Sequence, residues 1–302
     1  MTKIALAGIG KIARDQHVPA LAASPDWELA ATISRSGTVA GVPAYGDFAA
    51  FLSERPDVPV VSLCLPPQPR FAYAEAALRA GRHVMLEKPP GQTLAEVEAL
   101  RALAREAGVT LFATWHSRMA HAVEPARAFL AGRGIRAARI TWREDVRRWH
   151  PGQDWVFEPG GMGVFDPGIN ALSILTRILP APVRLTGAEL EVPANRQTPI
   201  AARLAFSGGV SAEFDWRAGA DQCWDITVET DAGTLALTGG GARLALDGTL
   251  LAEGPNREYP GLYARMARLV AAGESDVDPA PMIHVADAFT LGRRIVTDPF
   301  DW

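Results

Sequence analysis

Cysteine is scarce in this chain, and long apolar runs are missing. The two cysteines among 302 residues, Cys64 and Cys223, lie far apart and lack the close spacing of metal ligands, so we expect free thiols and no bound metal. No apolar stretch approaches the length that spans a membrane, and a strand-like run begins at residue 3 where a signal peptide would lie. These features predict a protein of the reducing cytoplasm.

An excess of charge of one sign is also lacking. The chain carries 30 Lys and Arg against 34 Asp and Glu, a net charge of −4, which gives no attraction for nucleic acid or an anionic membrane. Hydrophobic residues make up 48% and charged residues 21%, as in ordinary globular proteins. The length allows two domains, each with its own core. A small-molecule partner is therefore favoured.

The most informative feature that is present is the run Lys3 to Ala13, KIALAGIGKIA. It predicts a strand that turns tightly at Gly8, with Gly10 and a small third residue completing a GxGxxG/A pattern. Gly10 lets the backbone approach a pyrophosphate, and the helix N-terminus at Lys11 and Ile12 faces its negative charge. A tight turn without a ligand is the alternative. The strand before it and the helix after it favour a dinucleotide site.

The residues that follow the second predicted strand, 28–33, indicate which dinucleotide binds. It runs into Ser34-Arg35-Ser36 and lacks the carboxylate that NAD sites place on the adenosine ribose. Arg35 can clamp a ribose 2′-phosphate, and Ser34 can donate to it. A solvated loop arginine is the alternative. The sequence predicts NADP as the preferred cofactor, with NAD tolerated.

Two patterns divide the chain. Residues 1 to about 116 alternate strand and helix, as in a parallel sheet covered on both sides. After about residue 118, a helix at 166–179 precedes four or five strand-like runs between 183 and 246, and two helices, 262–272 and 283–296, close the chain. We expect a dinucleotide-binding domain at 1–117 and a substrate domain at 118–302. The C-terminal helix can pack back on the first domain, and the ligands would meet in a cleft between the two.

Two segments carry side chains suited to catalysis. Lys88, in Glu87-Lys88-Pro89-Pro90, follows a predicted parallel strand at its carboxyl end, where ligands gather, and can hold a substrate hydroxyl. A surface turn is the alternative there. Asp166 and Asn170 lie four residues apart at a predicted helix start, so their side chains share one face. Helix capping by Asp166 is the alternative, which the flexible glycine-rich approach at 158–163 makes less attractive.

Between these segments, residues 142–150 mix aromatic with hydrogen-bonding side chains. Flat apolar faces together with donors and acceptors are what a sugar requires of its site. Each of these side chains alone is more often a core or surface residue. The candidates for sugar contact are Glu144, Trp149, His150, His116 and Trp224.

The runs GIGKIARDQH, EKPPG and EPGGMGVFDPGINALS give the chain a resemblance to the Gfo/Idh/MocA oxidoreductase family over essentially its whole length. Within that family, it is similar to bacterial 1-dehydrogenases of L-arabinose and D-galactose. The resemblance implies a Rossmann domain followed by an α/β domain with an open, mainly antiparallel sheet, and a homodimer or homotetramer. It also implies oxidation of a cyclic aldose at C1 to the lactone, with hydride transfer to NADP or NAD.

Residue by residue, the resemblance implies that Lys88 contacts the reacting hydroxyl and that Asp166 is the general base. Asn170 stands where the family usually has a catalytic histidine. The implied sugar contacts are the candidates named above together with Lys88, Asp166 and Asn170, and the implied cofactor contacts are Gly8, Gly10, Lys11, Ile12, Ser34, Arg35, Cys64, Pro66, Glu87 and Lys88. The alternatives are an inositol- or other polyol-type dehydrogenase, which more often keeps the histidine, and a non-enzymatic NADP-sensing regulator, which tends to lose Lys88 and Asp166.

Overall fold

The protein is described by a computed structural model that covers residues 1–302. The chain divides into two compact units. Unit 1 comprises Met1–His116 and Tyr259–Pro279, and unit 2 comprises Ser117–Glu258 and Ala280–Trp302. A parallel sheet with helices, followed by a mainly antiparallel sheet with helices, confirms the predicted α/β class.

Unit 1 is built on a six-stranded parallel sheet in the order β3-β2-β1-β4-β5-β6. Its central strands consist almost entirely of buried apolar residues, because helices cover both faces. The strands are β1 (Thr2–Ala7), β2 (Trp27–Ile33), β3 (Ala44–Tyr45), β4 (Val60–Leu63), β5 (His83–Leu86) and β6 (Leu111–Ala113). In this topology the connections that follow β1, β2, β4 and β5 leave the carboxyl edge of the sheet, where ligands gather in such folds.

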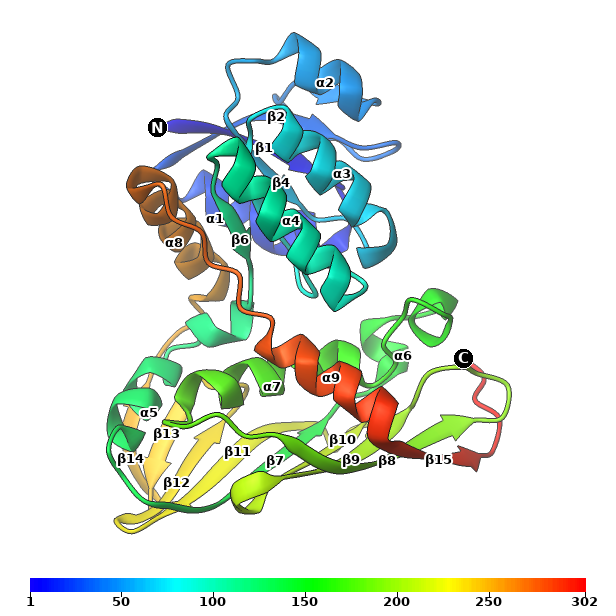
Figure 1. The fold of residues 1–302 in the computed structure, drawn as a ribbon, viewed down its shortest axis with the longest axis vertical. Coiled ribbons are helices and arrows are strands. Elements are labelled where there is room, and N and C mark those ends of the chain that lie inside the picture. Colours follow the sequence, from blue (N-terminus) through cyan, green and yellow to red (C-terminus); the bar gives the residue numbers. More distant parts are fainter. The chain divides into compact units, whose positions relative to one another are not determined.

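The helices of unit 1 lie on both sides of this sheet (Figure 1). They are η1 (Ala13–His17), α1 (Val18–Ala22), α2 (Phe48–Glu54), α3 (Pro67–Arg79), α4 (Leu94–Ala107) and α8 (Glu258–Ala272), which joins the unit from Tyr259 onward. Thr93 is the N-cap of α4, and its Oγ1 accepts from Glu96 N at 3.2 Å. The Glu96 carboxylate accepts from the backbone N–H of Gln92 at 2.7 Å. At the other end of α4, Gly108 has the positive φ of 65° that a helix stop requires.

Unit 2 is built on a nine-stranded sheet in the order β14-β13-β12-β11-β7-β10-β9-β8-β15. The pairs β7–β10 and β8–β15 are parallel, and the other neighbours are antiparallel. The strands are β7 (Ile135–Arg143), β8 (Leu185–Pro193), β9 (Ala201–Phe206), β10 (Val210–Asp215), β11 (Cys223–Thr230), β12 (Gly233–Thr238), β13 (Arg243–Leu246), β14 (Thr249–Glu253) and β15 (Gly292–Thr297).

The α-helices of unit 2 gather on one face of that sheet (Figure 1). They are α5 (Val123–Leu130), α6 (Val146–Trp149), α7 (Phe165–Ile178) and α9 (Ala280–Leu291). Three short helical turns complete the list: η2 (His116–Met119), η3 (Asp154–Phe157) and η4 (Ser207–Gly209), which joins β9 to β10. Along β7, Ala138, Ile140 and Trp142 are buried, while the alternate residues are not. Side chains alternate between the two faces of a strand, so one face of the sheet is buried beneath α7.

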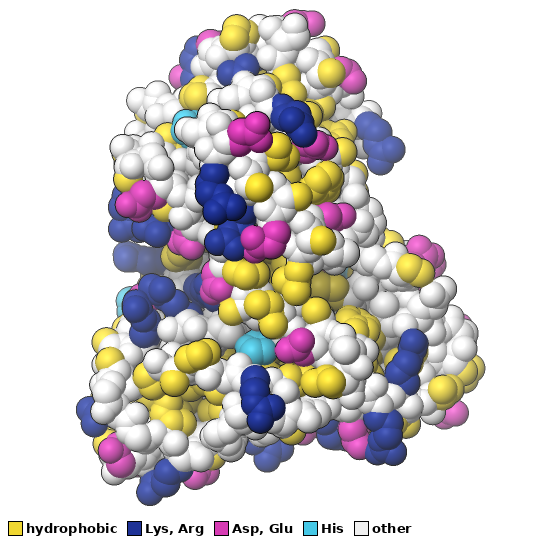
Figure 2. Space-filling view, viewed as in Figure 1, with side chains coloured by type: hydrophobic (Ala, Val, Ile, Leu, Met, Phe, Trp, Pro, Cys, Tyr) yellow, Lys and Arg dark blue, Asp and Glu magenta, His cyan; other side chains and the backbone are white.

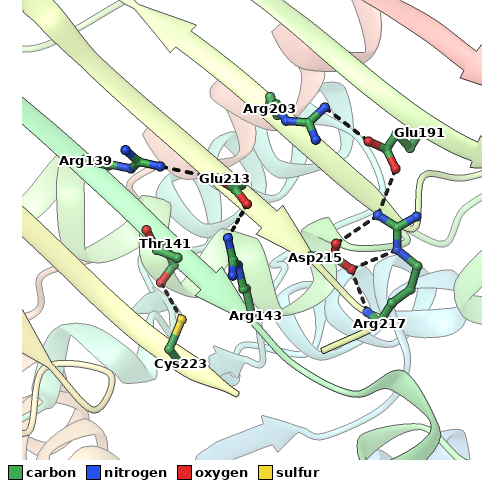
Figure 3. A network of polar contacts seen from close by, with 9 residues as sticks. All are labelled: Arg139, Thr141, Arg143, Glu191, Arg203, Glu213, Asp215, Arg217 and Cys223. Atoms are coloured by element: carbon green, nitrogen blue, oxygen red, sulfur yellow. Dashed lines mark hydrogen bonds and ion pairs between the residues drawn. The ribbon is translucent and has the colours of Figure 1, made fainter. Parts of the chain in front are cut away.

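The opposite face of the nine-stranded sheet carries charged side chains (Figure 3). Glu213 pairs with Arg143 at 2.5 Å and with Arg139 at 3.5 Å. Arg217 bridges Asp215 at 2.9 Å and Glu191 at 2.8 Å. This alternation of charges keeps an otherwise open sheet face polar.

Two expectations about the end of unit 2 are wrong. Six strands, not four or five, lie between residues 183 and 246. The last predicted helix ends at Leu291, and Gly292–Thr297 form the edge strand β15. From Gly292 onward the chain pairs in parallel with β8, and a side chain at Gly292 would collide with the carbonyl of Ala288.

One face of the molecule shows how its charged side chains are distributed. On the face drawn in Figure 2, basic and acidic side chains are interspersed. No helix is both long enough and apolar enough to cross a bilayer. No group of three or more His, Cys, Asp or Glu side chains is placed to hold a metal ion.

Candidate active site

The glycine turn after β1 has the geometry that a dinucleotide requires. Gly8 has φ +92°, and a methyl group there would lie 3.0 Å from Leu65 N, so glycine is needed at this position. A methyl group on Gly10 would meet no other atom within 4 Å. The helical segment begins at Lys11, and Ala13 is fully buried beneath it. The backbone is thus open at Gly10, where the sequence pattern places the pyrophosphate.

The loop after β2 packs directly against this turn. A Cβ on Gly37 would lie 2.5 Å from Ile9 O, so this loop can approach the turn only because residue 37 is glycine. Ser34 Oγ accepts from Gly37 N at 3.0 Å, which folds the loop on itself. Arg35 is exposed. Gly37 was not predicted as a site residue, although it directly follows Ser34-Arg35-Ser36 in the sequence.

The other predicted cofactor residues lie on neighbouring connections of unit 1. Cys64 follows β4 directly, is buried, and donates its backbone N–H to Ala7 O at 2.8 Å. Pro66 is the N-cap of α3. Ile12 is 39% exposed in the first turn of the helical segment, and Lys11 pairs with Asp15. These residues surround the carboxyl ends of β1, β2 and β4.

Glu87 has a different environment from the other predicted cofactor residues, because its carboxylate is buried and fully engaged. Oε1 lies 3.1 Å from His17 Nε2 and accepts from the Tyr259 hydroxyl at 2.9 Å. Oε2 accepts from the backbone N–H of Lys88 at 3.0 Å. His17 Nδ1 shares a hydrogen bond of 2.7 Å with the Tyr263 hydroxyl. The sequence analysis missed this buried cluster of His17, Glu87, Tyr259 and Tyr263.

Electrostatics make the His17–Glu87 contact an ion pair. Burial by itself raises the pKa of the Glu87 carboxyl, but His17, with the charges of His116 and Arg70, lowers it to about 2. Burial by itself lowers the pKa of His17, whereas Cys64, Tyr263 and Glu87 together raise it well above its usual value. The side chains of His17 and Glu87 are 1% and 6% exposed.

This cluster fixes the backbone that carries Lys88. Glu87 holds the N–H of Lys88, and Arg70 donates to the carbonyl of Glu87 at 2.6 Å and to that of Pro89. The Lys88–Pro89 peptide bond is cis. The sequence alone does not determine this isomer. His116 stacks on the ring of Tyr259, with centroids 5.7 Å apart and planes at 18°. His116, a predicted sugar contact, therefore borders the buried cluster of unit 1.

In unit 2, Asp166 is the second residue of α7 and does not cap it. The N-cap is Val164, and no side chain caps this helix end. The capping alternative for Asp166 is therefore wrong. Its carboxylate is paired with His150 instead, with Oδ2 3.1 Å from Nε2. Asn170 follows one turn later, half-buried, on the same helix.

The segment that enters η3 holds His150. His150 Nδ1 lies 3.3 Å from Gln153 Oε1, and the Trp155 indole N–H donates to that same oxygen at 3.1 Å. The His150 ring packs against Trp216 at 5.4 Å between centroids. Gln153 and Trp155 were missed by the sequence analysis, although they follow the predicted run by only a few residues.

Glu144 and Trp224 form a second polar group in unit 2. The indole N–H of Trp224 donates to Glu144 Oε1 at 2.8 Å, and that of Trp142 donates to the same oxygen at 3.3 Å. Trp224 and Trp142 are directly opposite each other on β11 and β7. Trp149 is 42% exposed and donates to Gln222 Oε1 at 2.8 Å. The predicted sugar contacts of unit 2 thus cluster at the ends of these strands and on the loop after them.

These features define an NAD(P)-binding oxidoreductase of the Rossmann type followed by an α/β domain. A family model described as "Oxidoreductase family, NAD-binding Rossmann fold" matches residues 2–114. A galactose 1-dehydrogenase of Pseudomonas fluorescens is 42% identical over 302 residues, covering 99% of this chain and 98% of that protein. The chain therefore belongs to the Gfo/Idh/MocA oxidoreductase family, which confirms the resemblance drawn from its motifs.

Solved structures agree with this assignment. The crystal structure of a D-galactose-1-dehydrogenase from Rhizobium etli superposes with a TM-score of 0.96 at 55% identity, covering 99% of this chain and 97% of that one. A 3-ketoreductase from Actinomadura kijaniata, solved with NADP, superposes with a TM-score of 0.84 at 22% identity, which shows a shared fold.

Proposed function

We propose that this protein is an aldose 1-dehydrogenase that oxidises D-galactose, L-arabinose or both at C1 to the lactone. The observation that carries the proposal is the similarity over nearly the whole chain to two galactose 1-dehydrogenases, at 42% and 55% identity. The position of Asp166 supports it, because this carboxylate is paired with His150 and is not used in capping.

The proposed cofactor is NADP, with NAD tolerated. The open backbone at Gly10 fits a pyrophosphate, and the exposed Arg35 beside Ser34 fits a ribose 2′-phosphate. The loop that carries Arg35 contacts the glycine turn through Gly37, which supports the same assignment. When bound, the nicotinamide of NADP or NAD supplies the hydride acceptor.

The chain's own residues would then manage the proton and the charge. Asp166 accepts the proton of the C1 hydroxyl, so that electron density moves onto C1 and its hydrogen leaves as hydride. Lys88 and Asn170 stabilise the negative charge that develops on O1. Glu144, Trp149, His150, His116 and Trp224 contact the sugar, with Glu144 accepting from ring hydroxyls and the indoles covering C–H faces. These roles follow from the family resemblance together with the placements described above.

The proposal includes both sugars because their hydroxyl stereochemistry around the ring is the same. L-Arabinose carries a hydrogen where D-galactose carries a hydroxymethyl group at C5. A difference of this size gives only about 1–3 kcal/mol of discrimination, or roughly 10- to 200-fold. The proposal also includes a reducing cytoplasm, supported by the free thiols of Cys64 and Cys223, and a homodimer or homotetramer.

A substrate panel tests the proposal. Purified protein is mixed with NADP or NAD and with D-galactose, L-arabinose, D-glucose or myo-inositol, and the absorbance of the reduced cofactor is followed. We expect turnover with D-galactose or L-arabinose and faster turnover with NADP. Turnover of inositol without turnover of either aldose would favour the polyol dehydrogenase instead. Cofactor binding without turnover of any sugar would favour the sensing regulator.

A further inference from the structure

The pair formed by His150 and Asp166 is the feature of unit 2 with the most chemical consequence. His150 is the residue after α6, and Asp166 is in the first turn of α7. Their side chains are 20% and 12% exposed, with Nε2 and Oδ2 3.1 Å apart. The family usually supplies a histidine from position 170, which is asparagine here. The structure places another imidazole against the same aspartate from a different element.

The neighbours of His150 determine where its protons lie. An indole N–H can only donate, so the atom of Gln153 that faces Trp155 is its oxygen. The same oxygen faces His150 Nδ1 at 3.3 Å, so Nδ1 must carry a hydrogen. Nε2 faces a carboxylate oxygen, which also accepts. A further proton between Nε2 and Oδ2 completes this donor–acceptor pattern, as in an imidazolium hydrogen-bonded to a carboxylate.

The side chains that contact His150 come from α7, from η3 and its N-cap, and from the residue after β10. The ionisable group among them is Asp166, on α7. Gln153 is the N-cap of η3, Trp155 lies within η3, and Trp216 follows β10. None of these three carries a charge. The proton shared with Asp166 is therefore not drawn toward a competing group on His150.

We propose that His150 is a catalytic residue that works as one unit with Asp166, and that Gln153 and Trp155 are its positioning residues. This inference rests on the proposed function. In the reactive state Nδ1 carries one hydrogen, a second proton lies between Nε2 and Oδ2, and the imidazolium keeps Asp166 ionised. The O1–H bond breaks, its proton binds the Asp166 carboxylate, and the C1–H electron pair leaves with hydrogen as hydride for the nicotinamide. The pair then holds one proton more than before, and it returns that proton to water before the next turnover.

The experiment compares pH profiles of kcat and kcat/KM for the wild type, His150→Asn and Trp155→Phe, with galactose and saturating NADP. Asparagine keeps a donor near Asp166 but carries no charge, so Asp166 takes up a proton more readily. We expect the acid limb of the His150→Asn profile to move up by about one pH unit or more. We also expect kcat at the wild-type optimum to fall about 10-fold or more.

Trp155→Phe keeps the ring but removes the N–H that orients Gln153. The Gln153 amide can then turn its NH₂ toward Nδ1, which allows the other tautomer. We expect a smaller movement of the acid limb in the same direction, with the KM for NADP unchanged. Trp302→Phe is the matched control, because its indole N–H donates to the neighbouring Asp154 at 2.8 Å and not to Gln153. Its profile should match that of the wild type.

Each outcome separates the inference from the function on which it rests. If the wild type oxidises no aldose, the proposed function fails. If the wild type is active and the acid limb of His150→Asn is unmoved, the role of His150 is refuted while the proposed function stands. If His150→Asn does not fold, Trp155→Phe decides, since a profile identical to that of Trp302→Phe contradicts the positioning chain.

Discussion

The protein contains two carboxylate–histidine pairs with the same separation and different surroundings. Glu87 and His17 in unit 1 and Asp166 and His150 in unit 2 each bring a ring nitrogen to 3.1 Å from a carboxylate oxygen. The first pair is 6% and 1% exposed, and the second is 12% and 20% exposed. The buried pair of unit 1 is shielded from water and fixes the backbone at Lys88. The pair of unit 2 is partly accessible, so it can exchange protons with water.

The partners of the two pairs explain this difference further. Each oxygen of Glu87 already accepts from a hydrogen bond donor of unit 1, so this carboxylate has little capacity left for a substrate proton. Asp166, in the first turn of α7, is paired with His150 and is less deeply buried than Glu87. A histidine beside a carboxylate is thus not by itself a sign of catalysis, and the remaining partners of the carboxylate decide its role.

Substitution of Asp166 should have the largest effect. Asp166→Asn keeps the size of the side chain but removes the base, so we expect kcat to fall about 10²- to 10⁴-fold. Binding of NADP, followed by quenching of tryptophan fluorescence, should be unchanged. Asp166→Ala should behave in the same way. Turnover near the wild-type rate in either variant would show that the base is another residue.

Breaking the buried pair should affect stability first. His17→Gln leaves the Glu87 carboxylate buried without its cationic partner, a change that costs about 3–5 kcal/mol. Urea unfolding followed by far-UV circular dichroism measures this loss. An unchanged unfolding midpoint would contradict the ion pair described for unit 1.

The pH dependence of that loss follows from the two pKa shifts. The pKa of His17 is raised, so its contribution is fully present below its usual value of 6.5 and is lost as pH rises through the raised value. The pKa of Glu87 is lowered to about 2 from 4.5, so its contribution is present above 4.5 and is lost as pH falls toward 2. The difference in unfolding midpoint between wild type and His17→Gln should therefore shrink at alkaline pH. A difference that grows there would reverse the sign and refute the shift.

Arg35 tests whether unit 1 also selects the cofactor. Charge-assisted hydrogen bonds to a phosphate contribute about 1.5–3 kcal/mol, so Arg35→Ala should raise the KM for NADP about 10- to 150-fold. The KM for NAD, which lacks the 2′-phosphate, is the internal control and should change little. Equal effects on both cofactors would remove Arg35 from the phosphate site.

The smallest effect is expected on the open face of the nine-stranded sheet. Glu213→Gln removes the carboxylate that pairs with Arg139 and Arg143 (Figure 3). These arginines are 65% and 42% exposed, so the loss of stability should stay below about 1 kcal/mol, with kcat unchanged. A loss of stability as large as that of His17→Gln would show that burial does not determine how much an ion pair contributes to stability.

Local patterns predicted the parts of the fold that local interactions determine. The glycine turn and the strand–helix alternation of unit 1 were both visible, because each depends on residues close in sequence. The helix predicted at 283–296 was too long, because Gly292–Thr297 pair with β8 as a strand, and that pairing joins residues far apart in the sequence.

The candidate site was predicted unevenly for the same reason. Asp166 and His150 were each identified, but their pairing was not. They belong to different elements, so their spacing in the sequence does not predict the contact. His17 and Glu87 are 70 residues apart, and Tyr259 is a further 172 residues along the chain. No periodic pattern links such positions. The sequence therefore predicted which residue types serve the chemistry, and the fold determined which of them act in pairs.

The central claim is that the two carboxylate–histidine pairs have separate duties. The most direct test measures kcat with D-galactose and NADP, together with the urea midpoint, in Asp166→Asn and His17→Gln side by side. We predict that Asp166→Asn loses turnover at a wild-type midpoint, whereas His17→Gln unfolds at a clearly lower urea concentration. An Asp166→Asn variant that turns over normally, or a His17→Gln variant as stable as the wild type, would contradict the account.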